Sequence, residues 1–420
     1  MYAGAALRID AAAIAHNTRL ISGLVGATSA GQAGVGQAGV GRAGAGKAGG
    51  GSGGTTVMAV VKADGFGHGV AALAALDAGA SWLGVTSIAE ALPFRWRGVS
   101  VPILSWLNPP GADLDAALLH DIDLAVPSIA QLQAVRTAAR RTGRRARIHL
   151  HLDTGLARDG IDRCEWTALC ELARLAEAAG ELKTVGVMSH LARADEPGHP
   201  ETLRQVLLFR NALRAARHRG LTPTLAHLAA TAGAITDPST HFGMVRIGAG
   251  LYGIDPSHTL ATAGTAGRTL RGAMTLTAPV TTVRDVNAGT GVGYGHRYVT
   301  DRRTRLALLP VGYADGIPRN LAPGAGVLLR GRRAPIVGTV SMDQVVLDVG
   351  ETGIQVGELA TLFGPGDDEE PTVREWATWA GTIEHDIVTR IGPRVARETI
   401  GAGVVASVTP LHDAFTRGAA

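Results

Sequence analysis

Lysine is scarce in this chain of 420 residues. Only Lys47, Lys62 and Lys183 are lysines, and arginine supplies the other positive side chains. Arginine keeps its charge inside proteins, whereas a buried lysine can lose its proton and act as an amine. Lys62 follows an apolar run in VMAVVKADGFGHG, residues 57–69, and a glycine-rich turn comes directly after it. A lysine at the end of a predicted buried strand points to chemistry that needs a neutral amine.

Cysteine and long apolar runs are also rare. The two cysteines, Cys164 and Cys170, fit no metal-ligand spacing, and on one helix they would lie about 240° apart around its axis. The N-terminus has no signal-peptide pattern, and no apolar run is long enough to span a bilayer. We therefore expect a cytoplasmic protein with reduced thiols and no membrane partner.

Positive charge is modest, with a net charge of +4. Its densest cluster is RRTGRRAR at residues 140–147, which could be read as a nucleic-acid patch. No aromatic residues interleave with these arginines, which favours a solvated helix end and loop. We expect no nucleic-acid partner and no bound metal.

The order of apolar runs predicts an α/β fold. After a low-complexity Gly/Ala segment at residues 26–54, interpreted as a flexible insertion, eight short β-branched runs alternate with helical patterns up to residue 254. Ser87 with Glu90 has the pattern of a capping box at the start of one helix. Eight such repeats predict a (β/α)8 TIM-like barrel over residues 1–265.

Beyond the barrel, the helical period gives way to strand-like runs separated by Gly and Pro turns. These runs predict a C-terminal β-rich domain over residues 266–420, interrupted by one helical stretch at residues 369–391. The first run of the chain, ALRID, leads to Asp10, a plausible helix cap. This strand, within residues 1–10, can join the β-rich domain.

Polar and charged residues collect where the barrel strands are predicted to end, the edge at which barrel enzymes hold their chemistry. They are Lys62, His151, Asp153, Arg158, Ser189, His190, Thr231 and Arg246. Taken singly, His190 could be a structural histidine, Arg246 could pair with a core carboxylate, and Asp153 could cap a turn. Lys62 is harder to dismiss, because a desolvated lysine beside an arginine has a lowered pKa and can attack a carbonyl. Pyridoxal 5'-phosphate, a carbonyl cofactor with a phosphate tail, suits such a set.

Seven motifs carry a resemblance to a known family. AVVKADGFGHG, DTGLARDG, SHLARADE, MVRIGAGLYG, VGYGHRY, VGYADGIPR and GTVSMDQ occur in the order seen in alanine racemases. The chain resembles that family over nearly its whole length, apart from residues 26–54. The resemblance implies a pyridoxal-phosphate enzyme that interconverts L- and D-alanine, as in the synthesis of peptidoglycan precursors. It also implies a homodimer whose active sites are shared between subunits.

The resemblance also implies roles for individual residues. The two catalytic bases would be Lys62, which would hold the cofactor covalently, and Tyr294 of the partner subunit. The implied cofactor-binding positions are Lys62, Phe66, Arg158, His190, Thr231, Arg246, Gly248, Ala249 and His385. The implied substrate-binding positions are Arg158, Tyr313, Met342 and Asp343.

Several positions depart from the family pattern. Phe66 and His385 stand where tyrosines that reach the cofactor's phosphate are usual. His151 stands where many members carry a carbamylated lysine, and its imidazole could accept a hydrogen bond from Arg158. These departures leave open a racemase of another small amino acid such as serine, or a weak paralogue that binds the cofactor. A decarboxylase on the same architecture is disfavoured by Arg246, because a carboxylate usually faces the ring nitrogen in those enzymes.

Overall fold

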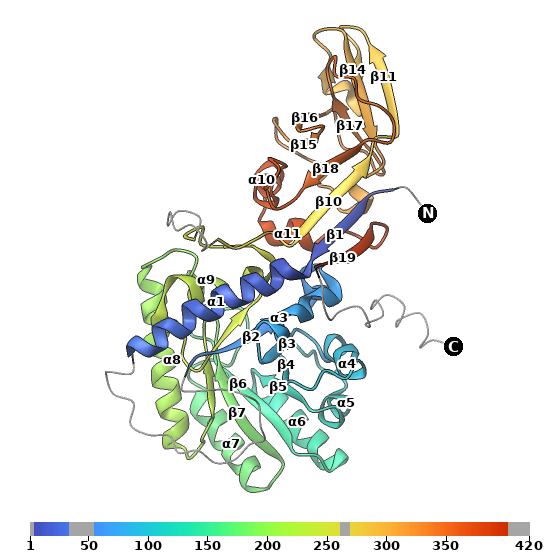
Figure 1. Cartoon of the computed structure of the whole chain (residues 1–420). Coiled ribbons are helices and arrows are strands. Elements are labelled where there is room, and N and C mark those ends of the chain that lie inside the picture. Colours follow the sequence, from blue (N-terminus) through green and yellow to red (C-terminus); the bar gives the residue numbers. More distant parts are fainter. Residues whose placement is uncertain (1–3, 33–53, 261–268, 402–420) are drawn as a thin grey trace.

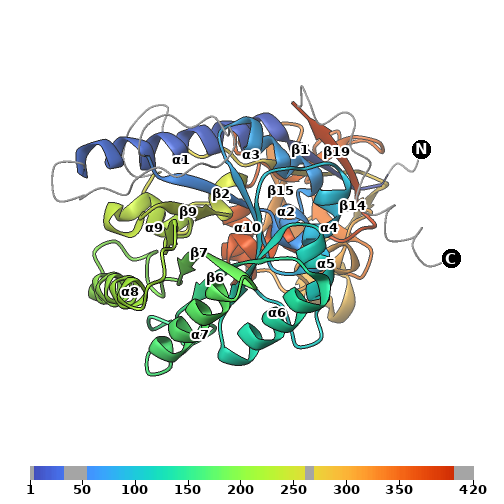
Figure 2. The same ribbon diagram turned by 90° about the horizontal axis from the view of Figure 1, so that it is seen from below.

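A closed parallel barrel and a β-rich domain make up the protein, whose computed structural model describes residues 4–32, 54–260 and 269–401 (Figure 1). Eight parallel strands close the barrel in sequence order, which confirms the predicted TIM-like fold (Figure 2). They are β2 (Thr56–Val60), β3 (Trp82–Val85), β4 (Ile103–Ser105), β5 (Ile122–Val126), β6 (Ala146–His151), β7 (Leu182–Met188), β8 (Leu225–His227) and β9 (Met244–Ile247). Most of their residues are buried, because helices cover the outside and side chains fill the inside.

Helices connect the strands around the barrel. They are α1 (Ala11–Gln32), α2 (Lys62–Phe66), α3 (Ala74–Asp77), α4 (Ile88–Trp96), α5 (Leu114–Leu119), α6 (Ile129–Thr142), α7 (Trp166–Ala178), α8 (Pro200–His218) and α9 (Thr231–Thr236), with the 3-10 turns η1 (Gly69–Leu73), η2 (Pro238–Thr240) and η3 (Ala249–Tyr252). Helix α6 shows how the sequence specifies such an element. Ser128 Oγ caps it by accepting the Gln131 N–H at 3.1 Å, and Leu132 and Val135 are buried.

The β-rich domain is a nine-stranded sheet in the order β11-β14-β17-β16-β15-β18-β10-β1-β19. Its strands are β1 (Ala6–Asp10), β10 (Met274–Pro279), β11 (Thr282–Val286), β14 (Thr304–Leu309), β15 (Gly326–Leu329), β16 (Arg332–Val337), β17 (Val345–Asp348), β18 (Leu359–Phe363) and β19 (Ala396–Ile400). The smaller elements are the hairpin of β12 (Gly291–Val292) and β13 (Tyr298–Val299), the turns η4 (Tyr294–His296) and η5 (Tyr313–Asp315), and the helices α10 (Val373–Ala380) and α11 (Glu384–Thr389). The N-terminal strand β1 pairs antiparallel with β10 and parallel with β19, so the first strand belongs to this sheet.

Two predictions about segments need correction. The low-complexity segment was expected to begin at residue 26, but α1 continues to Gln32, because extending an existing helix adds a hydrogen bond for each residue ordered. The helical stretch predicted at residues 369–391 is two helices, separated at Gly381, whose left-handed φ of 64° ends α10. Residues 33–53, and the predicted domain boundary at residue 265, lie outside the described residues.

Smaller expectations can be compared with the described residues. Both cysteines are free thiols, one exposed and one buried. Two arginines of the basic cluster pair with carboxylates, Arg140 with Glu181 at 2.6 Å and Arg141 with Asp115 at 2.5 Å. Across the described ranges, no helix combines the length and the apolar character needed to cross a bilayer.

Candidate active site

Lys62 begins a left-handed turn at the mouth of the barrel. Strand β2 ends at Val60, two residues earlier than the predicted end at Lys62. Ala63, Asp64 and Phe66 then take φ values of 52°, 52° and 55°. Each non-glycine residue in this region costs about 1–2 kcal/mol, so the surrounding structure must hold the turn in place. The turn lies opposite α11 of the β-rich domain, which packs against α2.

The amine of Lys62 is half-buried, and its environment favours the neutral form. Burial is the main cause that lowers the pKa of Lys62, and the charge of Arg158 lowers it further. The carboxylate of Glu90 acts in the opposite direction and raises it. The amine lies 5.8 Å from the centre of the Phe66 ring. This is the setting in which a lysine becomes a nucleophile or a base.

Arg246, in β9, is fully buried and makes its hydrogen bonds without a carboxylate. Its Nη1 donates to His227 Nδ1 and to the His227 carbonyl, both at 3.0 Å. Its Nη2 donates to His190 Nδ1 at 3.0 Å and to the carbonyls of Ser189 (2.8 Å) and Leu228 (3.1 Å). Burial, assisted by Arg158, lowers the pKa of Arg246 to about 10, so the side chain stays charged near neutral pH. No described residue accepts from Nε, which leaves that donor for a ligand.

Arg246 also determines the protonation of two histidines. A guanidinium only donates, so His190 Nδ1 and His227 Nδ1 must both be acceptors. Burial, with the charge of Arg246, lowers the pKa of His190 well below its ordinary value. Burial, with His149 and Arg246, does the same for His227. Both rings are therefore neutral with the proton on Nε2, and His227 donates it to His149 Nδ1 at 2.8 Å.

Small residues after β8 and β9 shape the neighbouring end of the site. Thr231 is buried, and its Oγ accepts the N–H of Gly250 at 3.2 Å. Ala249 is also buried. A Cβ on Gly248 would lie 2.9 Å from Phe66 Cζ, so only glycine lets the ring come this close. Thr231, Gly248 and Ala249 therefore share this end of the barrel with the lysine turn.

His385, in α11, reaches the same end from the β-rich domain. Its ring centre is 6.0 Å from that of Phe66. Burial is the main cause that lowers its pKa; Glu384 raises it and the charge of Lys62 lowers it. Its Nδ1 is buried and has no hydrogen-bond partner among the described residues. An orphaned buried nitrogen of this kind indicates a site for an absent ligand.

In the loop after β6, Asp153 caps a turn, as one interpretation of the sequence predicted, but Arg158 does not bond to His151. Asp153 caps a turn, accepting the N–H groups of Gly155, Leu156 and Ala157 at 2.7–3.0 Å. The expected hydrogen bond from Arg158 to His151 is absent from the described residues. His151 Nδ1 instead lies 3.5 Å from Asp159 Oδ2, and the side chain of Arg158 is exposed.

The other predicted residues, Tyr294, Tyr313, Met342 and Asp343, lie in the β-rich domain. Backbone bonds join η5 to residues 341–342, with Tyr313 N donating to Ser341 O at 3.1 Å. Asp343 accepts from Arg394 at 2.7 Å. Tyr294 is 73% exposed and Met342 is 52% exposed. Tyr294 lies in η4, on the connection between β11 and β14. Among the described residues, none of these side chains makes a hydrogen bond, ion pair or ring contact with Lys62.

Two residues at the site were missed from the sequence. His227 was not recognised as the partner of Arg246, although a histidine inside an apolar barrel strand is itself unusual. Glu90 was expected to complete a capping box with Ser87. Ser87 Oγ does accept the Glu90 N–H at 3.2 Å, but the carboxylate turns away from Ser87. Oε1 of Glu90 accepts the N–H of Ala63 at 2.8 Å instead.

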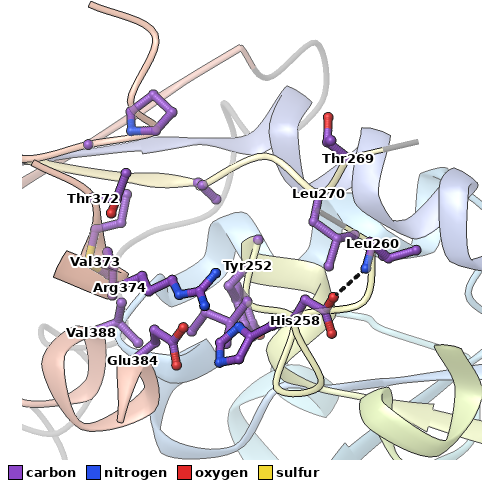
Figure 3. A pocket seen from close by; sticks show the side chains of 18 residues that line it. Tyr252, His258, Leu260, Thr269, Leu270, Thr372, Val373, Arg374, Glu384 and Val388 are labelled. Carbon is purple, nitrogen blue, oxygen red and sulfur yellow. Dashed lines mark hydrogen bonds between the residues drawn. The ribbon is translucent and has the colours of Figure 1, made fainter. Parts of the chain in front are cut away.

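A separate cavity of about 260 Å³ lies where the barrel meets the β-rich domain (Figure 3). Tyr252, His258, Arg374 and Glu384 are among its lining residues, and none of the predicted site residues is. Within the part of the chain that the structure describes, no cluster of histidine, cysteine and carboxylate side chains could hold a metal ion.

Comparison with known proteins agrees with this geometry over both domains. The family model "Alanine racemase, N-terminal domain" matches residues 47–256, and "Alanine racemase, C-terminal domain" matches residues 273–399. The alanine racemase of Frankia casuarinae is 48% identical over 350 residues, which cover 83% of this chain and 91% of that protein.

Solved structures show the same likeness. The alanine racemase of Streptomyces lavendulae, a D-cycloserine producer, aligns with a TM-score of 0.86 and 40% identity over 96% of this chain and 98% of that one. The alanine racemase of Bartonella henselae, solved with covalently bound pyridoxal phosphate, aligns with a TM-score of 0.78 and 26% identity over 95% and 100%. Because family models match both domains and a curated relative is 48% identical over 83% of the chain, the chain belongs to the alanine racemase family of enzymes.

Proposed function

We propose that the protein interconverts L- and D-alanine with pyridoxal 5'-phosphate, by a two-base mechanism that uses Lys62 and Tyr294 of the partner subunit. The observation that carries the proposal is the half-buried amine of Lys62, whose pKa is lowered by burial and by Arg158. Membership of the family supports it, as does the relative from Bartonella henselae that holds pyridoxal phosphate covalently.

The side chains present fit this cofactor. Pyridoxal phosphate, when bound, supplies an electron sink that makes the α-proton of an amino acid acidic. Arg246 would hold the ring nitrogen, since its Nε has no partner among the described residues. His385 would hold the phosphate together with Thr231, Gly248 and Ala249, because its buried Nδ1 has no other partner in the described chain.

Racemisation requires two proton-transfer groups on opposite faces of the substrate. Lys62 would exchange a proton on one face, because burial makes its neutral form accessible. Tyr294 of the partner subunit would exchange it on the other face. His190 supports that role, since it is neutral and carries its proton on Nε2, where it can donate to a phenolate. Arg158 would bind the substrate carboxylate, for which its exposed guanidinium is free of intramolecular hydrogen bonds within the described chain.

The proposal requires a homodimer. Tyr294 and Met342 are exposed in the single chain, and Tyr313 is 39% exposed. With Asp343, these side chains would close the partner's substrate pocket. The cytoplasmic location expected from the sequence stays a prediction.

Two lysine substitutions test the function. Lys62→Ala should abolish racemisation and the visible absorbance of the covalently held cofactor. Lys183→Ala is the matched control, because Lys183 lies 3.4 Å from Glu177 in a surface ion pair and should retain both properties. Deuterium exchange into a panel of small amino acids would identify the substrate. Turnover at the wild-type rate in Lys62→Ala would refute the proposal.

A further inference from the structure

The turn that carries Lys62 needs support from outside itself. Ala63, Asp64, Gly65 and Phe66 have consecutive left-handed conformations, and three of these residues carry a Cβ. Local hydrogen bonds, from Gly65 N to Val61 O and from Gly67 N to Ala63 O, lie within the turn. Bonds inside a strained turn do not place it relative to the barrel, so another element must do so.

Glu90 supplies that support from helix α4. Its Oε1 accepts the N–H of Ala63, the first amide after Lys62, at 2.8 Å. Its Oε2 accepts both the backbone N–H and the hydroxyl of Thr86, at 2.8 and 2.7 Å. The backbone of Glu90 is held in turn by Ser87 Oγ at 3.2 Å. The carboxylate therefore links the residues that follow β2 to the residue that follows β3 through hydrogen bonds.

The same carboxylate acts on the charge of the lysine. Burial and Arg158 both lower the pKa of Lys62, and Glu90 is the group that raises it. His190 and His385 also face this region, and burial lowers the pKa of both, so they add little opposing charge at neutral pH. Glu90 is thus the negative group that acts on the amine most directly.

We infer that Glu90 is a positioning residue of this enzyme, which holds the left-handed turn after Lys62 in place and balances the positive charge around its amine. The inference rests on the proposed role of Lys62. It does not require Glu90 to touch cofactor or substrate. It means that α4 contributes to the active site through Glu90, in addition to the capping of its own first turn.

Glu90→Gln and Thr86→Val together separate the two functions of the side chain. The glutamine oxygen can still accept from Ala63, but its NH2 group would face the N–H of Thr86, where an acceptor is needed. The substitution also removes the negative charge. Thr86→Val keeps the charge and removes one anchor of the carboxylate. Glu375→Gln is the matched control, because Glu375 occupies the corresponding position of α10 and accepts the Thr372 N–H at 2.8 Å, in the β-rich domain.

The measurements use the cofactor-free dimer, so they do not depend on racemase activity. Amide exchange should rise about tenfold at residues 61–67 in Glu90→Gln, as expected when a local opening loses a charge-assisted hydrogen bond. Trace labelling of Lys62 with acetic anhydride across pH should show its midpoint moving to lower pH. Thr86→Val should speed the exchange while the midpoint stays near wild type, and Glu375→Gln should change neither.

Two outcomes would overturn the inference. One is unchanged exchange at residues 61–67 in both Glu90→Gln and Thr86→Val. The other is faster exchange in Glu90→Gln with the labelling midpoint of Lys62 at its wild-type value, which would leave Glu90 a purely structural role. Failure of the proposed function would appear separately, as activity retained by Lys62→Ala.

Discussion

The buried pair of His149 and His227 allows a quantitative prediction about the barrel core. His227 accepts from Arg246 through Nδ1 at 3.0 Å and donates through Nε2 to His149 at 2.8 Å. Neither histidine is exposed to solvent. Replacing one by leucine therefore removes a partner from a buried polar atom that water cannot reach. Replacing both removes the two polar atoms together.

The expected energies differ because a single substitution leaves a buried polar atom unpaired, whereas the double substitution does not. His149→Leu leaves the His227 N–H unpaired and should cost about 1–3 kcal/mol. His227→Leu leaves His149 Nδ1 unpaired and also removes a bond to the charged Arg246, for about 2.5–6 kcal/mol in all. The double variant loses the bond to Arg246, about 1.5–3 kcal/mol, and shares with His149→Leu the loss of the 3.4 Å contact between His149 Nε2 and Asp123 Oδ2. Its destabilisation should therefore be smaller than the sum of the single variants by about 2–6 kcal/mol, because neither unpaired polar atom remains.

Thermal unfolding of the cofactor-free protein, followed by circular dichroism, measures the effect. A change of 1 kcal/mol moves Tm by about 2–4 °C in a domain of this size, so His227→Leu should lower Tm by about 5 °C or more. His16→Leu is the control, because His16 makes one exposed hydrogen bond to Thr269 O, at 3.2 Å, and should change stability by less than about 0.5 kcal/mol. Strictly additive losses in the double variant would refute the reasoning.

Three further predictions concern other parts of the chain. Burial lowers the pKa of His68 to about 4 in the folded state, whereas the ordinary pKa of histidine is near 6.5. Between these two pH values the unfolded chain is protonated at this residue and the folded chain is not. Stability should therefore fall between pH 6.5 and 4, by about 3 kcal/mol from this group; equal pH slopes of Tm in wild type and His68→Asn would contradict this. Asn17→Leu should cost about 1.5–4.5 kcal/mol without changing cofactor affinity, because the buried amide bonds Leu251 O and both backbone groups of Arg271; an unchanged Tm would oppose it. Replacing residues 33–53 by a short Gly-Ser linker should leave kcat unchanged, because β2 begins at the end of the barrel opposite Lys62; a large drop would place that segment near the chemistry.

Much of the fold and part of the site could be predicted from local patterns. The eight barrel strands appear in the sequence as short β-branched runs, because a strand buried on both faces must be apolar throughout. Asp10 and Ser128 cap the helices that follow them, as their residue types suggested. Lys62 and Arg246 were also predicted, since a charge within a buried strand or at its end is rare enough to indicate function.

The remaining features depend on contacts between segments distant in sequence. Glu90 bonds an amide 27 residues away, and its capping pattern with Ser87 predicted a different partner. The contact of His151 with Asp159 instead of Arg158 depends on the conformation of the loop that carries both of these residues. Residue type specifies what a side chain can donate or accept, but the partner it meets is selected by the closure of the whole barrel. The pairing of β1 with β10 follows the same rule, because it joins residues 271 positions apart and no local pattern encodes such a register.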